Sequence, residues 1–236
     1  MIISSEDELE KLKDIGRICG RAVKIMAEAM EPGMTTRELD AIGRKFIEGE
    51  GAQSAPEVCY QFPGATCISI NEEVAHGIPG DRVLQPGDLI NIDVSAVKDG
   101  FFGDTGSSFA VGKVDAKRER LVRDGKRALW VGLSQVKTGA RLAAIGDAIG
   151  TFARKNRYTL IQNLASHGVG RSLHEEPTEI STWPDPDETR IMEEGLVFTV
   201  EPFLSAAISR KTAKAITGRC SRRLRHPLSS SSIPLS

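Results

Sequence analysis

The sequence of 236 residues contains no Asp or Glu after Glu201, although it has 32 acidic residues in all. The stretch after Glu201 holds seven of the 31 basic residues: Arg210, Lys211, Lys214, Arg219, Arg222, Arg223 and Arg225. Taking these seven from the total leaves 24 basic against 32 acidic residues, a net charge of −8 up to Glu201. We therefore expect an acidic body with a basic carboxyl-terminal segment. The overall net charge of −1 provides no global field that would attract nucleic acid.

Paired cysteines and long apolar runs are also lacking. The four cysteines form no Cys-x-x-Cys pair: Cys19, Cys59, Cys67 and Cys220. A chain of this length buries enough core to fold without disulfides. The first residues turn acidic at once, unlike a secretory signal, and no stretch approaches the roughly 18 apolar residues of a membrane span. We therefore expect a cytoplasmic protein with no membrane attachment.

Two helices are predicted at the start of the chain. Ser5 to Glu8 is typical of a capping box, and apolar residues then recur at three- and four-residue spacing until Pro32-Gly33. Thr35 to Glu38 is a second capping box, and it opens a helix that ends near Gly49.

A β-hairpin is predicted at residues 89–111. The stretches 89–97 and 101–111 are β-prone, and Lys98-Asp99-Gly100 between them is a hairpin turn signal. A short strand at residues 67–70 precedes them. The hairpin places Asp93 and Asp104 on neighbouring strands, where both carboxylates can lie on one face.

The second half of the chain repeats the order of helix, glycine break, helix and strands. Asp115 is predicted to cap a helix running to about Val136, followed by a helix over residues 141–156, a Pro-rich loop over residues 175–187 and a strand over residues 195–200. At one offset the two halves match in three pairs, which suggests an internal duplication: Gly33 with Gly139, Leu39 with Ile145, and Phe46 with Phe152. Residues 1–205 are expected to form one domain, and residues 206–236 a basic, Ser-rich tail without helix or strand periodicity.

Four potential metal ligands lie at the ends of β-like segments: Asp93, Asp104, His167 and Glu201. Taken singly, such an Asp is more often a turn residue and such a His more often a hydrogen-bonded structural residue. Together, three carboxylates and one imidazole suit borderline divalent metals such as Mn, Fe, Co or Zn. Two such ions close together generate hydroxide near neutral pH and polarise a peptide carbonyl. The set therefore predicts a hydrolytic metal centre.

Several motifs together resemble type I methionine aminopeptidases. They are Cys67-Ile68-Ser69-Ile70-Asn71-Glu72-Glu73-Val74-Ala75-His76-Gly77-Ile78-Pro79, the hairpin from Asn91 to Asp104, His167-Gly168-Val169-Gly170, Leu173-His174-Glu175-Glu176-Pro177 and Phe198-Thr199-Val200-Glu201-Pro202. Each motif alone is modest, but their order and spacing, from about residue 5 to Ser205, are specific to this family.

The resemblance implies an α+β pita-bread fold, in which two related halves surround a central antiparallel sheet. It implies that the four candidate ligands, Asp93, Asp104, His167 and Glu201, bind two divalent ions, with Asp104 shared. It also implies that His76 and His174 contact the substrate and support the transition state, and that Glu201 acts as a proton shuttle. The implied activity is removal of the initiator methionine from nascent polypeptide N-termini by a monomeric enzyme, with the ribosome as a further partner. A pocket for the methionine side chain would include Cys59, Tyr60, Phe62 and Cys67, although composition alone makes these four equally good core residues.

The resemblance fails at the carboxyl-terminal end. The family closes with a strand carrying a metal-bridging Glu followed by His-Thr, preceded by a Gly-Trp-Thr segment, and residues 202–236 contain neither. Such a sharp change of composition is what an out-of-frame reading produces, a hypothesis that the coding DNA would test. We expect a weakly bound second ion, because two dications repel more strongly with one fewer charge between them, together with slower turnover and lower stability.

Two other functions remain open. A proline-directed peptidase would share the fold, but those relatives carry an additional amino-terminal domain. A non-catalytic remnant that binds peptide or ribosome is favoured by the missing ligand and disfavoured by the retained ligands and histidines. Contact of the basic tail with RNA rests on seven charges alone, and His226 in that tail is interpreted as a surface residue.

Overall fold

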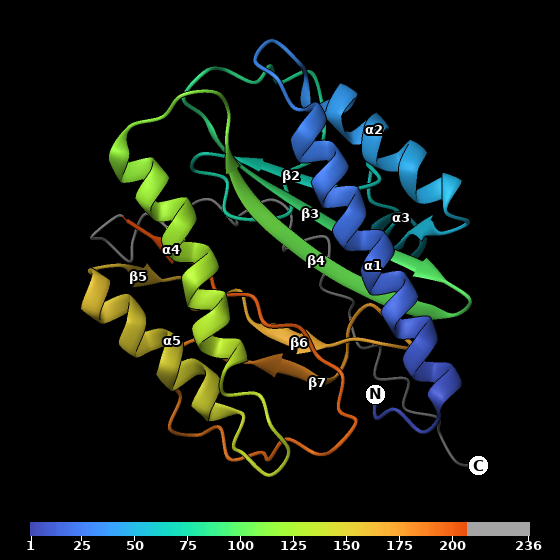
Figure 1. Cartoon of the computed structure of the whole chain (residues 1–236), viewed down its shortest axis with the longest axis vertical. Helices are drawn as coiled ribbons and strands as arrows, with labels where there is room; N and C mark the ends of the chain where they lie inside the picture. The colour runs from blue at the N-terminus through green and yellow to red at the C-terminus, as the bar shows by residue number, and fades with distance from the viewer. Residues whose placement is uncertain (207–236) are drawn as a thin grey trace, which may run out of the picture.

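The computed structural model describes residues 1–206, in which two pairs of helices flank a set of strands (Figure 1). The first half contains α1 (Glu6–Ala29), α2 (Thr36–Gly49), β1 (Gln53–Ser54), α3 (Ala55–Tyr60), β2 (Cys67–Ile70), β3 (Leu89–Lys98) and β4 (Phe101–Ala110). The second half contains α4 (Ala116–Leu133), α5 (Ala143–Asn156), β5 (Thr159–Leu160), β6 (Ser166–Gly168), β7 (Glu175–Ile180) and β8 (Leu204–Ser205). The expectations about the tail, including Cys220, His226 and the lost last strand, fall on residues outside this described part.

Side-chain caps determine where the helices begin. Thr35 and Glu38 form the complete capping box that was predicted for α2. The box predicted for α1 is only half formed: the Ser5 hydroxyl accepts from the Glu8 backbone N–H, but the Glu8 carboxylate accepts from the backbone N–H of Ser4. Asp115 caps α4 as predicted, and that helix ends at Leu133, slightly before the expected end.

The largest sheet places two of the candidate ligands on one face. Strand β3 pairs along one edge with β4. Along its other edge it pairs with β2 over its first part and with β1 near its end, and all these pairs are antiparallel. In the β3–β4 hairpin Asp93 is opposite Gly106, and Asp104 is opposite Ser95. Because side chains two residues apart on a strand point to the same face, Asp93 and Asp104 project to the same side, as the sequence predicted.

Two expectations about the second half are wrong. The predicted loop at residues 175–187 begins instead with β7, which pairs with β6. Its Glu- and Pro-rich sequence has low β propensity, so pairing with β6 rather than local preference creates the strand. The predicted strand at residues 195–200 forms only isolated bridges, Leu196 with Ile2 and Phe198 with Gly168. These bridges join it to different segments, so no continuous ladder develops.

The internal duplication is confirmed by backbone hydrogen bonds that recur in the two halves. Before α2, the Gly33 N–H donates to the Leu84 carbonyl at 2.9 Å, and the Leu84 N–H donates to the Met34 carbonyl at 2.8 Å. The Thr36 N–H donates to the Arg82 carbonyl at 2.9 Å. Before α5, Gly139 N–H donates to Met192, Met192 N–H to Ala140 and Leu142 N–H to Arg190, at the same three distances. Each helix entry is therefore held by an equivalent crossing segment.

Apolar packing follows this division. The larger core joins α1, α2 and the sheet, and its fully buried members include Ile15, Met26, Leu39, Ile92 and Phe101. A smaller core lies under α5 and contains Leu142, Ile145, Ile149, Ile180 and Met192. Within the described residues, no helix has the length and apolar character needed to cross a membrane.

Candidate metal centre

Three of the four predicted ligands meet where the two halves face each other. Asp104 comes from β4, His167 from β6 and Glu201 from the segment after the isolated bridges. One ligand atom from each lies within 4.8 Å of the others. The His167 Nε2 atom is 3.5 Å from Asp104 Oδ2 and 3.3 Å from Glu201 Oε1. Residues separated by up to 97 positions in the chain thus form one cluster.

Asp93 lies at the edge of this cluster, outside the group of three. It shares the sheet face of Asp104, and its carboxyl group is near enough to Asp104 and Glu201 to interact with both. Burial, followed by the negative charges of Asp104 and Glu201, raises the pKa of Asp93 well above its ordinary value. Asp93 is therefore held in an excess of negative charge.

Three hydroxyl groups position Asp104 and Glu201, two through the carboxylates and one through the backbone, and they were not predicted from the sequence. The Thr199 hydroxyl donates to Glu201 at 2.5 Å, and the Ser95 hydroxyl donates to Asp104 at 3.1 Å. The Ser166 hydroxyl accepts from the Glu201 backbone N–H at 2.8 Å. Thr199 lies two residues before Glu201, and Ser95 lies two residues after Asp93. Side chains two residues apart in an extended chain point to the same side, so this spacing could have indicated both hydroxyl groups. Such contacts fix the direction of a ligand's lone pairs.

His167 is held with one ring nitrogen facing the carboxylates. Its Nδ1 atom contacts the Gly168 carbonyl oxygen at 2.9 Å, so Nδ1 carries the proton and donates. Burial alone would lower the pKa of His167, but hydrogen bonds with Asp104 and Glu201 and their negative charge raise it to about 10. Among the described residues, no Lys or Arg forms an ion pair with Asp93, Asp104 or Glu201. Three carboxylates and one imidazole without another cation fit a bound divalent ion.

His174 lies directly beside this cluster. Its ring centroid is 4.1 Å from that of His167, and its Nδ1 atom is 2.6 Å from the Tyr60 hydroxyl. Loss of hydration and the charge of His167 lower the pKa of His174 to about 4, so the ring is neutral at physiological pH. Its second nitrogen, Nε2, is the ring nitrogen that does not contact Tyr60.

His76 approaches the cluster from a tight loop after β2. It has a φ of +56°, and the loop is fixed by Gly77, whose N–H donates to the Ser69 hydroxyl and whose carbonyl accepts from Ile68. Burial lowers the pKa of His76, while the charges of Glu201 and Asp104 oppose this effect. His76 is therefore near enough to Glu201 and Asp104 to feel the charge of both carboxylates.

The four proposed pocket residues divide into two groups. Cys67 is buried on β2 opposite Asp93, and Tyr60 reaches the site through His174. Cys59 is an exposed residue beside Leu173, and Phe62 is half-buried after α3 with its N–H bonded to Pro56. The structure therefore connects Tyr60 and Cys67 to the centre more directly than Cys59 or Phe62.

Fold and site together define a metal-dependent hydrolase of the α+β class, with carboxylates and histidines from two related halves meeting at one centre. Comparison with known protein families matches residues 10–222 to metallopeptidase family M24. The chain belongs to this family.

Individual relatives agree with the motifs in the sequence. A methionine aminopeptidase of Staphylococcus epidermidis is 50% identical over 206 residues, which cover 87% of this chain and 82% of that protein. Methionine aminopeptidase 2 of Bacillus subtilis is 46% identical over 206 residues, with 87% and 83% covered. The solved structure of methionine aminopeptidase from Rickettsia prowazekii superposes with a TM-score of 0.83 at 35% identity, covering 88% of this chain and 84% of that one. The resemblance to type I methionine aminopeptidases and the pita-bread fold are confirmed, and the chain is a metallo-aminopeptidase with a divalent metal cofactor.

Proposed function

We propose that this enzyme removes the initiator methionine from the N-termini of nascent polypeptides. The observation that carries the proposal is the meeting of Asp104, His167 and Glu201 next to the ring of His174. The names of the similar proteins from Staphylococcus epidermidis and Bacillus subtilis support the choice of methionine.

The ligands divide between two ions in this proposal. Asp104, His167 and Glu201 would hold the first ion, and Asp93 together with Asp104 would hold the second. The donor set suits Co, Mn, Fe or Zn. When bound, these ions supply hydroxide near neutral pH and polarise the peptide carbonyl.

The remaining residues position the substrate and move protons. Glu201, oriented by the Thr199 hydroxyl, accepts and passes on the proton of the attacking water. In the tautomer of His174 whose Nδ1 accepts from the Tyr60 hydroxyl, the Nε2–H would donate to the oxygen that becomes negative in the transition state. His76 supports the nitrogen of the scissile amide from the other side. Tyr60 and Cys67, with Cys59 and Phe62 further out, contact the methionine side chain.

A second ion would be held weakly by this chain. Residues 202–236 supply no carboxylate to bridge the two ions, so Asp93 and part of Asp104 carry the second one alone. Repulsion between two bound ions would then be less compensated, and we expect turnover lower by orders of magnitude than in a version with the family-type Glu-His-Thr strand. Equal turnover of the two versions would contradict this.

The test is methionine release from a Met-Ala-Ser peptide by the purified chain, with Co, Mn, Fe or Zn supplied in turn. Metal-dependent release that is lost in Glu201→Gln supports the proposal. A Pro-containing peptide without methionine, Ala-Pro-Ser, serves as the matched substrate for a proline-directed relative. Absence of release with every metal, from protein shown to be folded, would contradict the proposed activity.

A non-catalytic remnant that binds peptide or ribosome is the second candidate, and the lack of acid after Glu201 favours it. Such a remnant would bind a Met-Ala-Ser peptide without cleaving it, whatever the metal.

The solved prolidase of Pyrococcus furiosus is similar at 24% identity with a TM-score of 0.73, which shows a shared fold alone. The cytoplasmic location, the monomeric state and the ribosome contact stay predictions.

A further inference from the structure

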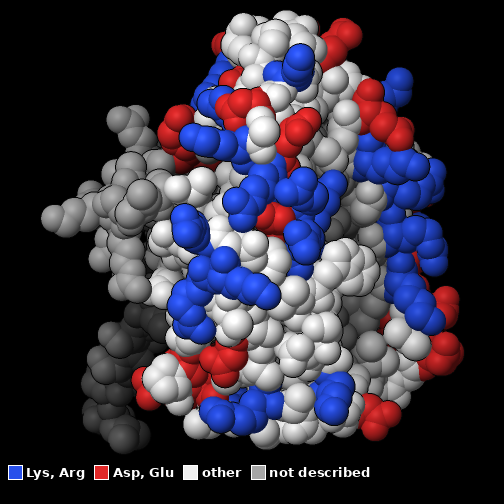
Figure 2. All heavy atoms as spheres, turned by 60° about the vertical axis from the view of Figure 1, so that its left-hand side comes forward, with Lys and Arg blue, Asp and Glu red and all other residues white. Residues whose placement is uncertain are grey.

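One face of the molecule concentrates positive charge far in excess of its surroundings. The α4–α5 face is defined by ten basic residues: Lys113, Lys117, Arg118, Arg120, Arg123, Lys126, Arg127, Arg154, Lys155 and Arg157. All ten are exposed. Residues 113–127 and 154–157 contain only three acids, Asp115, Glu119 and Asp124, so this face carries a net charge of +7 within a body of −8. Figure 2 shows Lys and Arg side chains gathered over this side of the molecule.

A buried carboxylate holds the central arginines in place. The side chain of Asp124 is 1% exposed, and it accepts hydrogen bonds from Arg120 at 3.1 Å, Arg127 at 3.4 Å and the Tyr158 hydroxyl at 2.9 Å. Arg123 lies 3.7 Å from the same carboxylate. Because these arginines are three and four residues apart on α4, their guanidinium groups form one row on the helix surface. A ligand that binds these arginines loses less side-chain entropy than one that binds unrestrained arginines, because Asp124 already restricts their rotamers.

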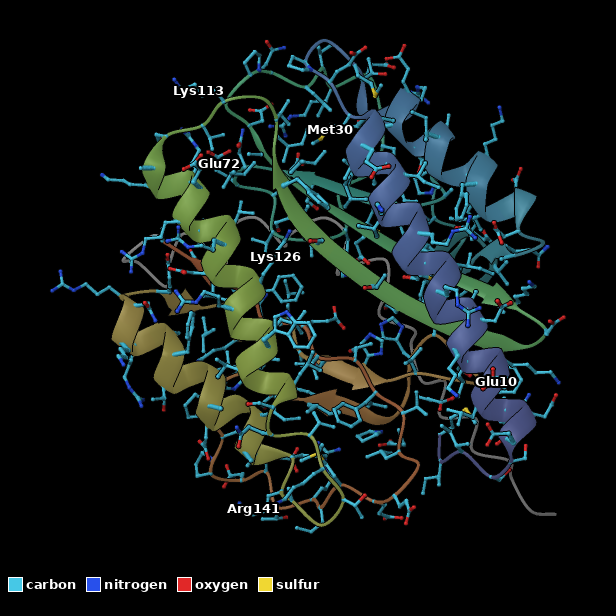
Figure 3. All side chains as sticks on the ribbon, viewed as in Figure 1. Glu10, Met30, Glu72, Lys113, Lys126 and Arg141 are labelled. Carbon is cyan, nitrogen blue, oxygen red and sulfur yellow. The ribbon has the colours of Figure 1, made fainter. Side chains whose placement is uncertain are left out.

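The row continues into an exposed aromatic ring. Trp130 is 70% exposed, and it follows Arg127 by three residues and Arg123 by seven, so all three share one side of α4. A ring of this size is normally packed against the protein. Lys126 lies midway along α4, next to this row, and Lys113 lies in the loop before the helix (Figure 3). The face thus combines fixed cations with a flat surface for stacking.

We propose that the α4–α5 face binds single-stranded RNA, with an unpaired base stacked on Trp130. The phosphates lie along Arg120, Arg123 and Arg127 and continue over the neighbouring side chains of Lys126, Arg154 and Lys155. Guanidinium groups match phosphate oxygens with paired hydrogen bonds, and aromatic rings stack on the bases of single strands. An acidic peptide would use the cations but leave Trp130 uncovered. A membrane surface would call for several exposed apolar residues, whereas Trp130 is the only large exposed one on α4. None of these residues belongs to the metal centre, so the proposal goes beyond the proposed peptidase activity.

The first test measures how binding depends on salt. The full chain is titrated with a labelled RNA of about 12 nucleotides at salt between about 50 and 200 mM, and fluorescence anisotropy gives the affinity. The triple variant K126Q/R154Q/K155Q leaves the contacts of Asp124 intact. We expect its slope of log affinity against log salt to be smaller by about 2, because each lost phosphate contact on a single strand removes about 0.7. The basic residues after Glu201 are present in every variant, so their contribution cancels.

The matched control removes the same charge elsewhere. K13Q/R17Q/K24Q changes three exposed basic residues of α1 and is expected to keep the slope of the unaltered chain. Equal slopes for the two triple variants would overturn the proposal, because binding would then depend on net charge alone. Preference for anionic phosphatidylserine vesicles over RNA would also overturn it.

The second test isolates the stacking interaction. Trp130→Ala is expected to bind RNA roughly tenfold more weakly, while its affinity for inorganic polyphosphate, which has no bases, stays unchanged. Trp130→Phe should retain most of the RNA affinity. Equal RNA binding by the alanine variant and the unaltered chain would overturn the proposed role of the ring. Methionine release, assayed in parallel, should be unchanged in all these variants, so failure of RNA binding is distinguishable from failure of the peptidase.

Discussion

Asp93 and Glu201 occupy equivalent positions in the two halves of the fold. Each follows by six residues a glycine with positive φ, Gly87 at +98° and Gly195 at +78°. The same spacing of 108 residues relates Leu84 to Met192, which make equivalent hydrogen bonds before α2 and α5. The duplication has therefore placed one carboxylate from each half beside Asp104 and His167.

Loss of the Thr199 hydroxyl is predicted to impair the centre without unfolding it. Thr199→Val keeps the shape but removes the hydrogen bonds that the hydroxyl makes with Glu201 and with the His167 backbone N–H, so metal affinity and kcat should each fall about tenfold. Thr199→Ser retains the hydroxyl and should recover most of both. Isothermal titration with Mn and a peptide assay would measure the two quantities. Identical behaviour of the Val and Ser variants would show that the hydroxyl has no orienting role.

Gly77 is predicted to be indispensable to the loop that carries His76. A Cβ atom at Gly77 would meet the Ile68 carbonyl oxygen at 2.0 Å and the Ser69 Cα at 2.9 Å, so the loop must move away from β2. Gly77→Ala should lower the free energy of unfolding by more than about 2 kcal/mol and reduce methionine release as His76 shifts.

Gly80 provides the matched control for this change. The nearest atom to a Cβ there is 4.0 Å away, so Gly80→Ala should leave stability within about 0.5 kcal/mol and activity unaltered. Urea denaturation and the peptide assay decide the comparison. A Gly77→Ala protein as stable as the Gly80→Ala protein would be incompatible with the packing described.

Removal of the metal is predicted to destabilise the folded chain. The negative charge of Asp93 is predicted to contribute to this loss of stability. Asp93, Asp104 and Glu201 repel one another when no cation lies between them. Chelation with EDTA should therefore lower Tm, and Asp93→Asn should raise the Tm of the metal-free protein while reducing the increase that added Mn produces. Differential scanning calorimetry measures all three values. A metal-free Asp93→Asn protein with a lower Tm than the unaltered chain would contradict the repulsion.

Asp124 is predicted to make stability depend on pH. Burial alone would raise its pKa, but hydrogen bonds from Tyr158 and Arg120 and the nearby arginine charges keep the pKa below its ordinary value. A carboxyl group with a depressed folded pKa stabilises the protein above its unfolded pKa of about 3.9, and this contribution is lost as pH falls through the folded pKa. Asp124→Asn should cost about 1–2 kcal/mol at neutral pH, and the difference should shrink as the pH is lowered toward about 3.

Denaturation curves at several pH values test this dependence. Asp7→Asn is the control, since Asp7 forms an exposed pair with Lys11 and its loss should be near neutral at every pH. A stability difference for Asp124→Asn that is constant between neutral and acidic pH would refute the prediction.

Local signals predicted the elements whose hydrogen bonds are local. The capping box of Thr35 and the turn at Asp99-Gly100, where both residues have positive φ, depend on a few adjacent residues. The shared face of Asp93 and Asp104 followed directly from that hairpin.

Features that depend on distant partners were missed or wrong. Strand β7 exists because of β6, and residues 195–200 reach Ile2 and Gly168 on different segments. The Ser166 hydroxyl contacts Glu201 across 35 residues, a spacing that no periodic pattern reports. His174 and His76 were predicted only from the resemblance to the family. Neither residue lies in a helix-like or strand-like repeat that would direct its side chain toward the metal centre.

The arrangement of the ligands along the chain also has a consequence for synthesis. The β3–β4 hairpin, with Asp93 and Asp104, is complete about ninety residues before Glu201 is added. A chain emerging from its amino end would thus form the larger core first, with two carboxylates facing solvent. Only after His167 and Glu201 emerge would the two halves close around the centre, so metal binding to the complete ligand set would be a late step of folding.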